Sequence, residues 1–212
     1  MDKIIDPKEL LIPAGEIIKD ISEVGIDSFL NDGVLKDLPV VNSIFSFYHM
    51  GKSIYAHHIC RQLIAFLKEV DAGSIPEAKR IEHAAQMDQN PKKAQKELHL
   101  VLDTIDRSNE EEKAGYFGKL YRAFVMAEIG WGQFTELTEV LTRMFIQDMP
   151  ILRQLKAGPI VNEGNGMYQC QRLQGIGLCT PPVTSVANGT LMMEHEYHIT
   201  SLGCLMLEIL DQ

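Results

Sequence analysis

Apolar residues recur at steps of three and four along most of this chain, which is the period of an amphipathic helix. The clearest example runs from Asn109 to Gln147. In this segment two apolar stripes flank the break Gly130-Trp131-Gly132, as expected for two antiparallel helices joined by a short turn. The positions predicted to face inward are Phe117, Leu120, Tyr121, Phe124, Val125, Phe134, Leu137, Leu141, Met144 and Phe145. The pattern predicts a helical hairpin that supplies a core.

The same period predicts further helices before this hairpin. Residues 40–70 are apolar over a wide arc, which is typical of a helix in the middle of a bundle. A helix is expected to end near Met87, and Asn90-Pro91 has the cap and first-turn residues that begin the next one. Residues 1–33 carry a weaker pattern, which predicts a loosely packed helical segment. Residues 34–157 are therefore predicted to form a multi-helix bundle.

The pattern changes after Gly158-Pro159. A short helix is expected from Met167 to Leu173, and glycine, proline and asparagine residues then indicate turns. From Leu191 to Ile199 apolar and polar residues alternate, which is the period of a half-buried strand. Thr200 is placed to cap a last helix. Residues 158–212 are therefore predicted to form a small α/β tail on a mainly α protein.

This tail resembles the second half of winged-helix domains. In that family a helix ends near a Gly-Leu pair, a β-hairpin wing follows, and a Tyr-x-Leu/Ile-Thr-x-x-Gly segment leads into a closing helix. The residues at those places are Gly177-Leu178, Tyr197, Ile199, Thr200 and Gly203. The rest of the chain is similar in its patterning to uncharacterised small helical proteins of bacteria and phages. The first resemblance implies DNA binding through the helix before the wing, and the second implies a link to phage or host defence.

The charge of the chain weighs against nucleic acid as the partner. The formal net charge of −9 disfavours general attraction to nucleic acid or to an anionic membrane. The candidate recognition helix offers Gln169, Gln171 and Arg172 but only one cation, whereas a DNA reader usually has several cations on one face. A DNA-binding regulator that uses Gln169 and Arg172 stays an alternative, beside packing or protein contact by the same segment.

Two other places are candidates for binding a partner. Trp131 lies between two glycines at the predicted hairpin tip, where the ring could anchor a partner or pack beneath the turn. Lys92, Lys93 and Lys96 gather near the start of one helix. They could bind a phosphate or an acidic partner, but the acidic residues interleaved with such lysines also fit a solvated face.

Catalytic and metal motifs are absent from the sequence. Neither GxSxG nor HExxH occurs, and the four cysteines form no CxxC pair, so no catalytic residue, metal or cofactor is predicted. The cysteine usage fits reduced thiols in a cytoplasm. No secretion signal and no run of about 18 apolar residues is present. A membrane-acting effector that uses residues 40–70 is a further alternative, against which Lys52 and Arg61 interrupt the apolar run.

The sequence as a whole predicts a cytoplasmic, non-enzymatic protein-interaction or regulatory module. Its helices carry ample apolar surface for a core, and a homodimer is an additional possibility because apolar faces are in surplus. The expected partner is a protein.

Overall fold

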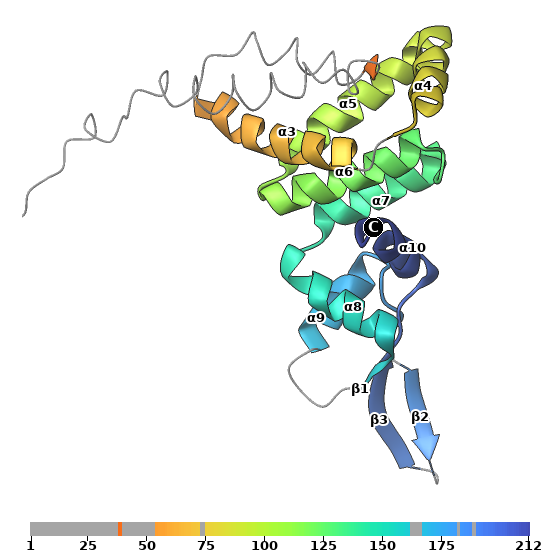
Figure 1. Ribbon diagram of the computed structural model, residues 1–212. Coiled ribbons are helices and arrows are strands. Elements are labelled where there is room, and N and C mark those ends of the chain that lie inside the picture. The colour runs from red at the N-terminus through yellow and green to blue at the C-terminus, as the bar shows by residue number, and fades with distance from the viewer. Residues whose placement is uncertain (1–37, 40–53, 73–74, 162–166, 182, 188–189) are drawn as a thin grey trace, which may run out of the picture. The chain divides into compact units, whose positions relative to one another are not determined.

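The computed structural model describes residues 38–39, 54–72, 75–161, 167–181, 183–187 and 190–212. The fold is mainly helical, with a small antiparallel sheet in its C-terminal part (Figure 1), so the predicted fold class is confirmed at this level. By contacts the chain divides into two compact units, residues up to Gly118 and Lys119–Gln212. The division falls inside one helix. The predicted segment 1–33 lies outside the described residues.

The first unit is built from helices that pack on α5. Helices α3 and α4 both contact α5, and the rings of Phe66 on α3 and Phe117 on α6 stack with their centroids 5.2 Å apart. Asn90 caps α5 as predicted, because its side chain accepts a hydrogen bond from the Lys93 N–H at 3.2 Å. The helices are α3 (Ile54–Ala72), α4 (Glu77–Gln89), α5 (Pro91–Arg107) and α6 (Glu111–Val125), of which α6 continues into the second unit.

A close approach of α3 and α6 fixes the core of this unit. A Cβ atom added to Gly118 would lie 2.9 Å from the Glu69 Cβ and closer still to the Phe66 carbonyl oxygen. Only glycine leaves room for that approach. No described helix of the chain is long and apolar enough to cross a membrane.

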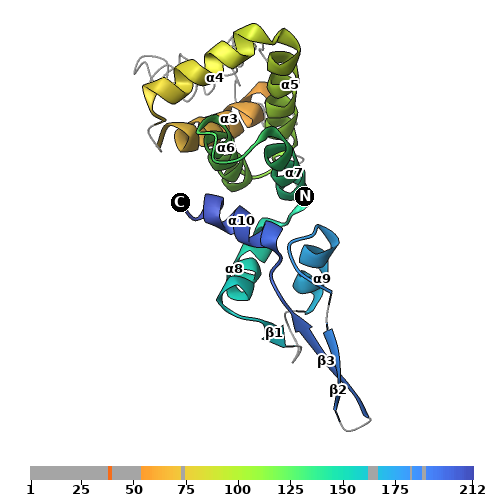
Figure 2. The same cartoon turned by 90° about the vertical axis from the view of Figure 1, so that its right-hand side faces the viewer.

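The second unit combines short helices with the sheet. The strands are antiparallel in the order β1-β3-β2, and β1 pairs with β3 through Ile160 opposite Tyr197. Figures 1 and 2 both show the β2-β3 hairpin extending away from α8, α9 and α10. The elements are α7 (Trp131–Arg143), the 3-10 turn η2 (Ile146–Asp148), α8 (Met149–Ala157), β1 (Ile160–Val161), α9 (Met167–Gly175), β2 (Val183–Ala187), β3 (Thr190–Tyr197) and α10 (Ser201–Leu210).

The predicted hairpin of helices exists, but its turn lies earlier than predicted. Helix α6 ends at Val125, and Ala127 adopts a left-handed conformation with φ of 60°. The N–H of Glu128 then donates to the Ala123 carbonyl at 2.9 Å, which closes the helix end in a Schellman motif. Trp131 is consequently the first residue of α7 and not part of the turn.

The second correction concerns the end of α7. The apolar period predicts that Phe145 faces inward, but the helix ends at Arg143 and both following residues are extended. Met144 therefore stays buried while Phe145 is 55% exposed. The helical period no longer decides which face a residue occupies once the backbone leaves the helix.

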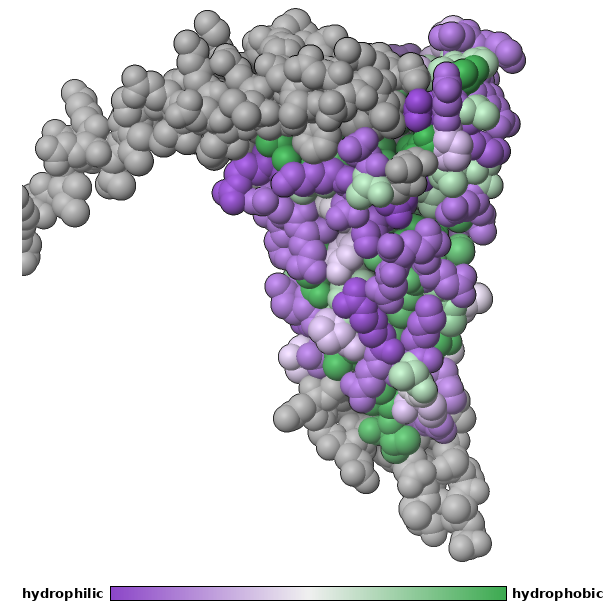
Figure 3. Space-filling view, viewed as in Figure 1, coloured by the Kyte–Doolittle hydropathy of each residue, from purple (hydrophilic) through white to green (hydrophobic). Residues whose placement is uncertain are grey.

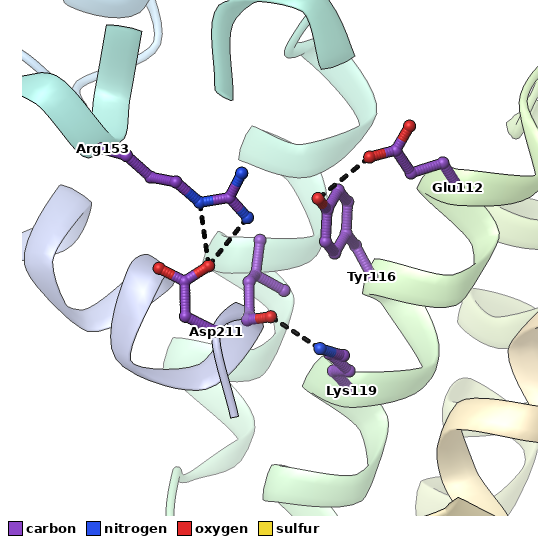
Figure 4. A network of polar contacts seen from close by, with 6 residues as sticks. Glu112, Tyr116, Lys119, Arg153 and Asp211 are labelled. Carbon is purple, nitrogen blue, oxygen red and sulfur yellow. Dashed lines mark hydrogen bonds and ion pairs between the residues drawn. The ribbon is translucent and has the colours of Figure 1, made fainter. Parts of the chain in front are cut away.

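Polar contacts hold the closing helix α10, whose predicted N-cap is confirmed. The Thr200 hydroxyl accepts a hydrogen bond from the Gly203 N–H and donates one to the Gly177 carbonyl. At the other end, Lys119 of α6 donates to the Leu210 carbonyl at 2.7 Å, where a cation also complements the helix dipole. Arg153 of α8 pairs with Asp211 (Figure 4). The predicted strand 191–199 is present as β3, which ends at Tyr197, two residues earlier than predicted.

Candidate functional site

The second unit holds an arginine in a fixed position near its surface. The Nε of Arg172, on α9, donates to the Asp148 Oδ2 at 2.9 Å, and its Nη2 donates to the Asp148 Oδ1. Asp148, the last residue of η2, is only 1% exposed. The hydrogen bond with Asp148 is the main reason that the pKa of Arg172 is raised. A paired fork of this kind fixes the plane of the guanidinium as well as its position.

Two exposed aromatic rings contact this guanidinium. Its central carbon lies 4.7 Å from the ring centroid of Phe145 and 5.0 Å from that of Tyr168, both within the range of cation–π attraction. The two rings are 55% and 57% exposed. Tyr168 and Arg172 are four residues apart on α9 and so share one face of the helix. We call Phe145, Tyr168 and Arg172 the aromatic–arginine cluster.

A hollow of about 260 Å³ opens beside the cluster. It lies where the end of α7 and η2 meet the C-terminal end of α9. Arg143 is exposed at this hollow, and its side chain makes no hydrogen bond or ion pair within the described ranges. The lining residues are Arg143, Met144, Phe145, Asp148, Arg172, Gly175 and Ile176. The arrangement therefore offers apolar side chains and one unpaired cation around the same space.

Two thiols lie buried in the same unit. Cys170 on α9 is 0% exposed and Cys179 is 3% exposed, and the Sγ of Cys179 donates to the Thr180 carbonyl at 3.4 Å. Burial, with the neighbouring Cys170 thiol, raises the pKa of Cys179 to about 12, and burial also raises the pKa of Cys170. Nucleophilic chemistry needs the thiolate form, so these cysteines act as packed apolar groups in the folded protein.

The first unit contains a buried histidine–carboxylate pair. His83 Nε2 lies 2.8 Å from Glu97 Oε1, and the two side chains are 5% and 0% exposed. Such a pair could serve as an acid and base only if substrate reached it. It is closed to solvent, and it joins α4 to α5. Elsewhere in the described ranges, no group of three or more His, Cys, Asp or Glu side chains is arranged to hold a metal ion.

The predicted site residues lie in both units. Lys92 and Lys96 are exposed on the first two turns of α5, and Lys93 there donates to Gln86 at 3.1 Å. Trp131 is half-buried, and the centroid of its ring lies 5.6 Å from that of Phe124. Of the two alternatives predicted for Trp131, this contact fits packing within the protein. A partner role for these residues stays a prediction.

The two predicted residues of α9 differ in their surroundings. The Oε1 of Gln169 is buried and has no hydrogen-bond partner in the part of the chain that the structure describes. Arg172, by contrast, is already paired with Asp148. The one cation that α9 offers is thus neutralised, and its guanidinium contacts two aromatic rings.

Sequence reasoning missed Phe145, Tyr168, Arg143 and Asp148. Phe145 was assigned to the core by its place in the helical period. The spacing of Tyr168 and Arg172 was a usable signal, since residues four apart on a helix meet. Asp148 lies 24 residues from Arg172 and gave no local signal.

Comparison with known proteins gives no match, whether with family models, curated proteins or solved structures.

Proposed function

We propose that this protein is a non-enzymatic cytoplasmic interaction module that binds a protein partner through the aromatic–arginine cluster of its second unit. The observation that carries the proposal is the presence of two half-exposed rings on one arginine that a buried carboxylate fixes. Tyrosine and arginine are enriched among the interface residues whose substitution by alanine costs the most binding free energy. Fixing them in advance lowers the ordering cost of association.

The distribution of exposed apolar side chains supports this assignment. Four large ones are exposed in the described part of the chain: Ile81, Phe145, Val161 and Tyr168. Single exposed apolar residues are normal on a soluble protein, but two of these four belong to one cluster beside a hollow. On the face drawn in Figure 3 the described surface is mostly hydrophilic, with apolar residues in small separate patches. A site of this kind suits a short recognition element better than a broad apolar interface.

Affinity purification with matched variants tests the proposal. The tagged full chain serves as bait in cells of its native host, beside Phe145→Ser/Tyr168→Ser and the control Ile81→Ser. Ile81 is 56% exposed on α4 and far from the cluster in sequence, so its substitution tests whether loss of an exposed apolar side chain elsewhere also removes binding. The expected result is a protein that is captured by the wild type and by the control but not by the double variant. The same protein, once purified, should bind the purified wild-type chain directly. Binding that ignores the double substitution would contradict the proposal.

A DNA-binding regulator is the second candidate, because one structural feature favours it. Helix α9 is followed by the β2-β3 hairpin and by α10, which is the order that the resemblance to winged-helix domains implies. Against it, Arg172 is paired with Asp148, and the hairpin segment 183–198 contains no lysine or arginine. Phosphate contacts supply most of the affinity for duplex DNA. Titration of a fluorescent duplex across a salt series separates the candidates, since a regulator must show salt-sensitive binding.

A further inference from the structure

The hollow beside the cluster is suited to a side chain and not to a large ligand. Its volume of about 260 Å³ lies below the roughly 300–1,000 Å³ of sites that enclose drug-sized molecules. Met144, Phe145 and Ile176 supply apolar lining, and Gly175 contributes no side chain. One apolar side chain of a peptide therefore matches it in size and chemistry.

The charges around the hollow favour an acidic occupant. Arg172 is neutralised by Asp148, so the unpaired Arg143 leaves the hollow with one net positive charge. At the end of α9, the carbonyl groups of Leu173 and Gln174 already accept hydrogen bonds from the N–H groups of Leu178 and Gly177. The charge of Arg143 attracts a carboxylate at short range, although the net charge of the chain is −9. Two copies of this chain, both strongly acidic, repel each other over the rest of the surface.

Resting on the proposed function, we propose that the partner presents an acidic peptide segment to this hollow. An apolar side chain of the segment enters between Met144 and Ile176. A neighbouring carboxylate pairs with Arg143, and the segment packs along the rings of Phe145 and Tyr168. Arg143 is then the residue that selects for acidic segments, while the aromatic–arginine cluster supplies contact area.

Two synthetic peptides serve as probes in place of the natural partner. Acetyl-EELFEE-amide carries the acidic and apolar features, and acetyl-QQLFQQ-amide keeps the apolar residues without the charge. Titration of the full chain, carrying ¹³C-labelled Met and Ile methyl groups, follows the signals of Met144 and Ile176. We expect both signals to shift with the acidic peptide, and its affinity to exceed that of the neutral peptide about two- to fivefold, as for an exposed charge pair.

Two variants with equal charge change isolate the role of Arg143. Arg143→Gln should abolish the preference for the acidic peptide. Arg107→Gln, at an exposed position in the last turn of α5, should retain it. Added salt should weaken the binding of the acidic peptide more than the binding of the neutral peptide.

Several outcomes would overturn the inference, and they can be told apart from failure of the proposed function. Equal binding of both peptides would exclude charge selection by Arg143. If neither peptide shifts the two methyl signals at millimolar concentration, or if size measurement shows a second copy on this surface, the inference fails. The proposed function survives those results when partner capture still requires Phe145 and Tyr168. The opposite result is peptide binding that depends on Arg143 while partner capture does not require Phe145 and Tyr168. That result would contradict the proposed function but would still show that the hollow is a binding site.

Discussion

Both carboxylate oxygens of Asp148 accept hydrogen bonds from the guanidinium of Arg172, and this buried acid thereby sets the position of an exposed aromatic pair. The pairing links the interior of the second unit to its surface. Asp148 is 1% exposed, so the guanidinium of Arg172 replaces the water that would solvate this carboxylate at the surface. An ion pair of this kind is weak evidence for stability by itself, but losing one partner is costly.

The first prediction is that Asp148 and Arg172 are energetically coupled. Arg172→Met should lower the urea midpoint, because a carboxylate then stays buried without its partner. Asp148→Asn/Arg172→Met should lose less stability than the two single variants added together. Arg153→Met is the control, since its ion pair with Asp211 is exposed at both ends and should matter less. Strict additivity in urea unfolding at pH 7 would contradict the coupling.

The helices were predictable from the sequence because their apolar residues keep the helical period over several turns. The period correctly predicted that Phe117 and Phe134 lie in the core, where both are 0% exposed. It failed at Phe145, because nothing in the apolar pattern marks Arg143 as the last helical residue. It also misplaced the turn before α7, since the left-handed residue there is Ala127 and not a glycine.

The candidate site was predictable only in part. Arg172 stood out as the single cation of its helix, and the structure places it at the centre of the cluster. Its partner Asp148 and the ring of Phe145 come from another part of the chain, more than 20 residues away. Long-range pairing of this kind leaves no periodic signal in one sequence, so the cluster could be recognised only from coordinates.

The second prediction contrasts two glycines of α6. Gly118→Ala should destabilise the first unit by about 1–3 kcal/mol or more, because the new methyl group collides with the backbone at Phe66. The new methyl group of Gly115→Ala meets the Glu69 Cγ at 3.5 Å and the Ala65 carbonyl oxygen at 4.0 Å, which are ordinary contacts. That substitution should be neutral or stabilising by up to about 1 kcal/mol, since alanine favours helix. Chemical denaturation of both variants checks this, and equal effects would show that α3 and α6 do not approach so closely.

The third prediction concerns two helix ends that use the same Schellman geometry with different residues. Ala127 adopts φ of 60° after α6, and Gly177 adopts φ of 82° after α9. Ala127→Gly should stabilise the protein by a few tenths to about 1 kcal/mol, because glycine removes the left-handed strain but costs more entropy on folding.

The reverse substitution serves as the comparison. Gly177→Ala should destabilise by about 1 kcal/mol, because its new methyl group meets only the Leu202 Cδ2 at 3.7 Å and the cost is conformational. Thermal unfolding of Ala127→Gly and Gly177→Ala shows whether each substitution raises or lowers the melting temperature. A stabilising Gly177→Ala would show that this residue is not left-handed in solution.

The fourth prediction orders three cysteines by their reactivity. Cys204 is half-buried, whereas Cys170 and Cys179 are almost fully buried and their pKa values are raised. With a pKa of about 12, only roughly one Cys179 in ten thousand is a thiolate at pH 8. Iodoacetamide at pH 8 should therefore modify Cys204 first, as read by peptide mass spectrometry. All three should react alike in urea, and early modification of Cys179 in the native protein would contradict its burial.

The last prediction is that alkaline pH destabilises the second unit through its buried acids. Burial raises the pKa of Cys179 from the usual 9.0 to about 12, and burial also raises the pKa values of Cys170 and Tyr197. Groups with a raised folded pKa contribute stability that is fully present below the unfolded pKa. That contribution is lost as pH rises through the window from 9 to about 12, at a slope of at most about 1.4 kcal/mol per pH unit and group. The urea midpoint should stay constant from pH 7 to 8 and fall above 9. Cys179→Ala should flatten that decline, and an unchanged slope would mean that its thiol ionises as easily in the folded protein as in the unfolded chain.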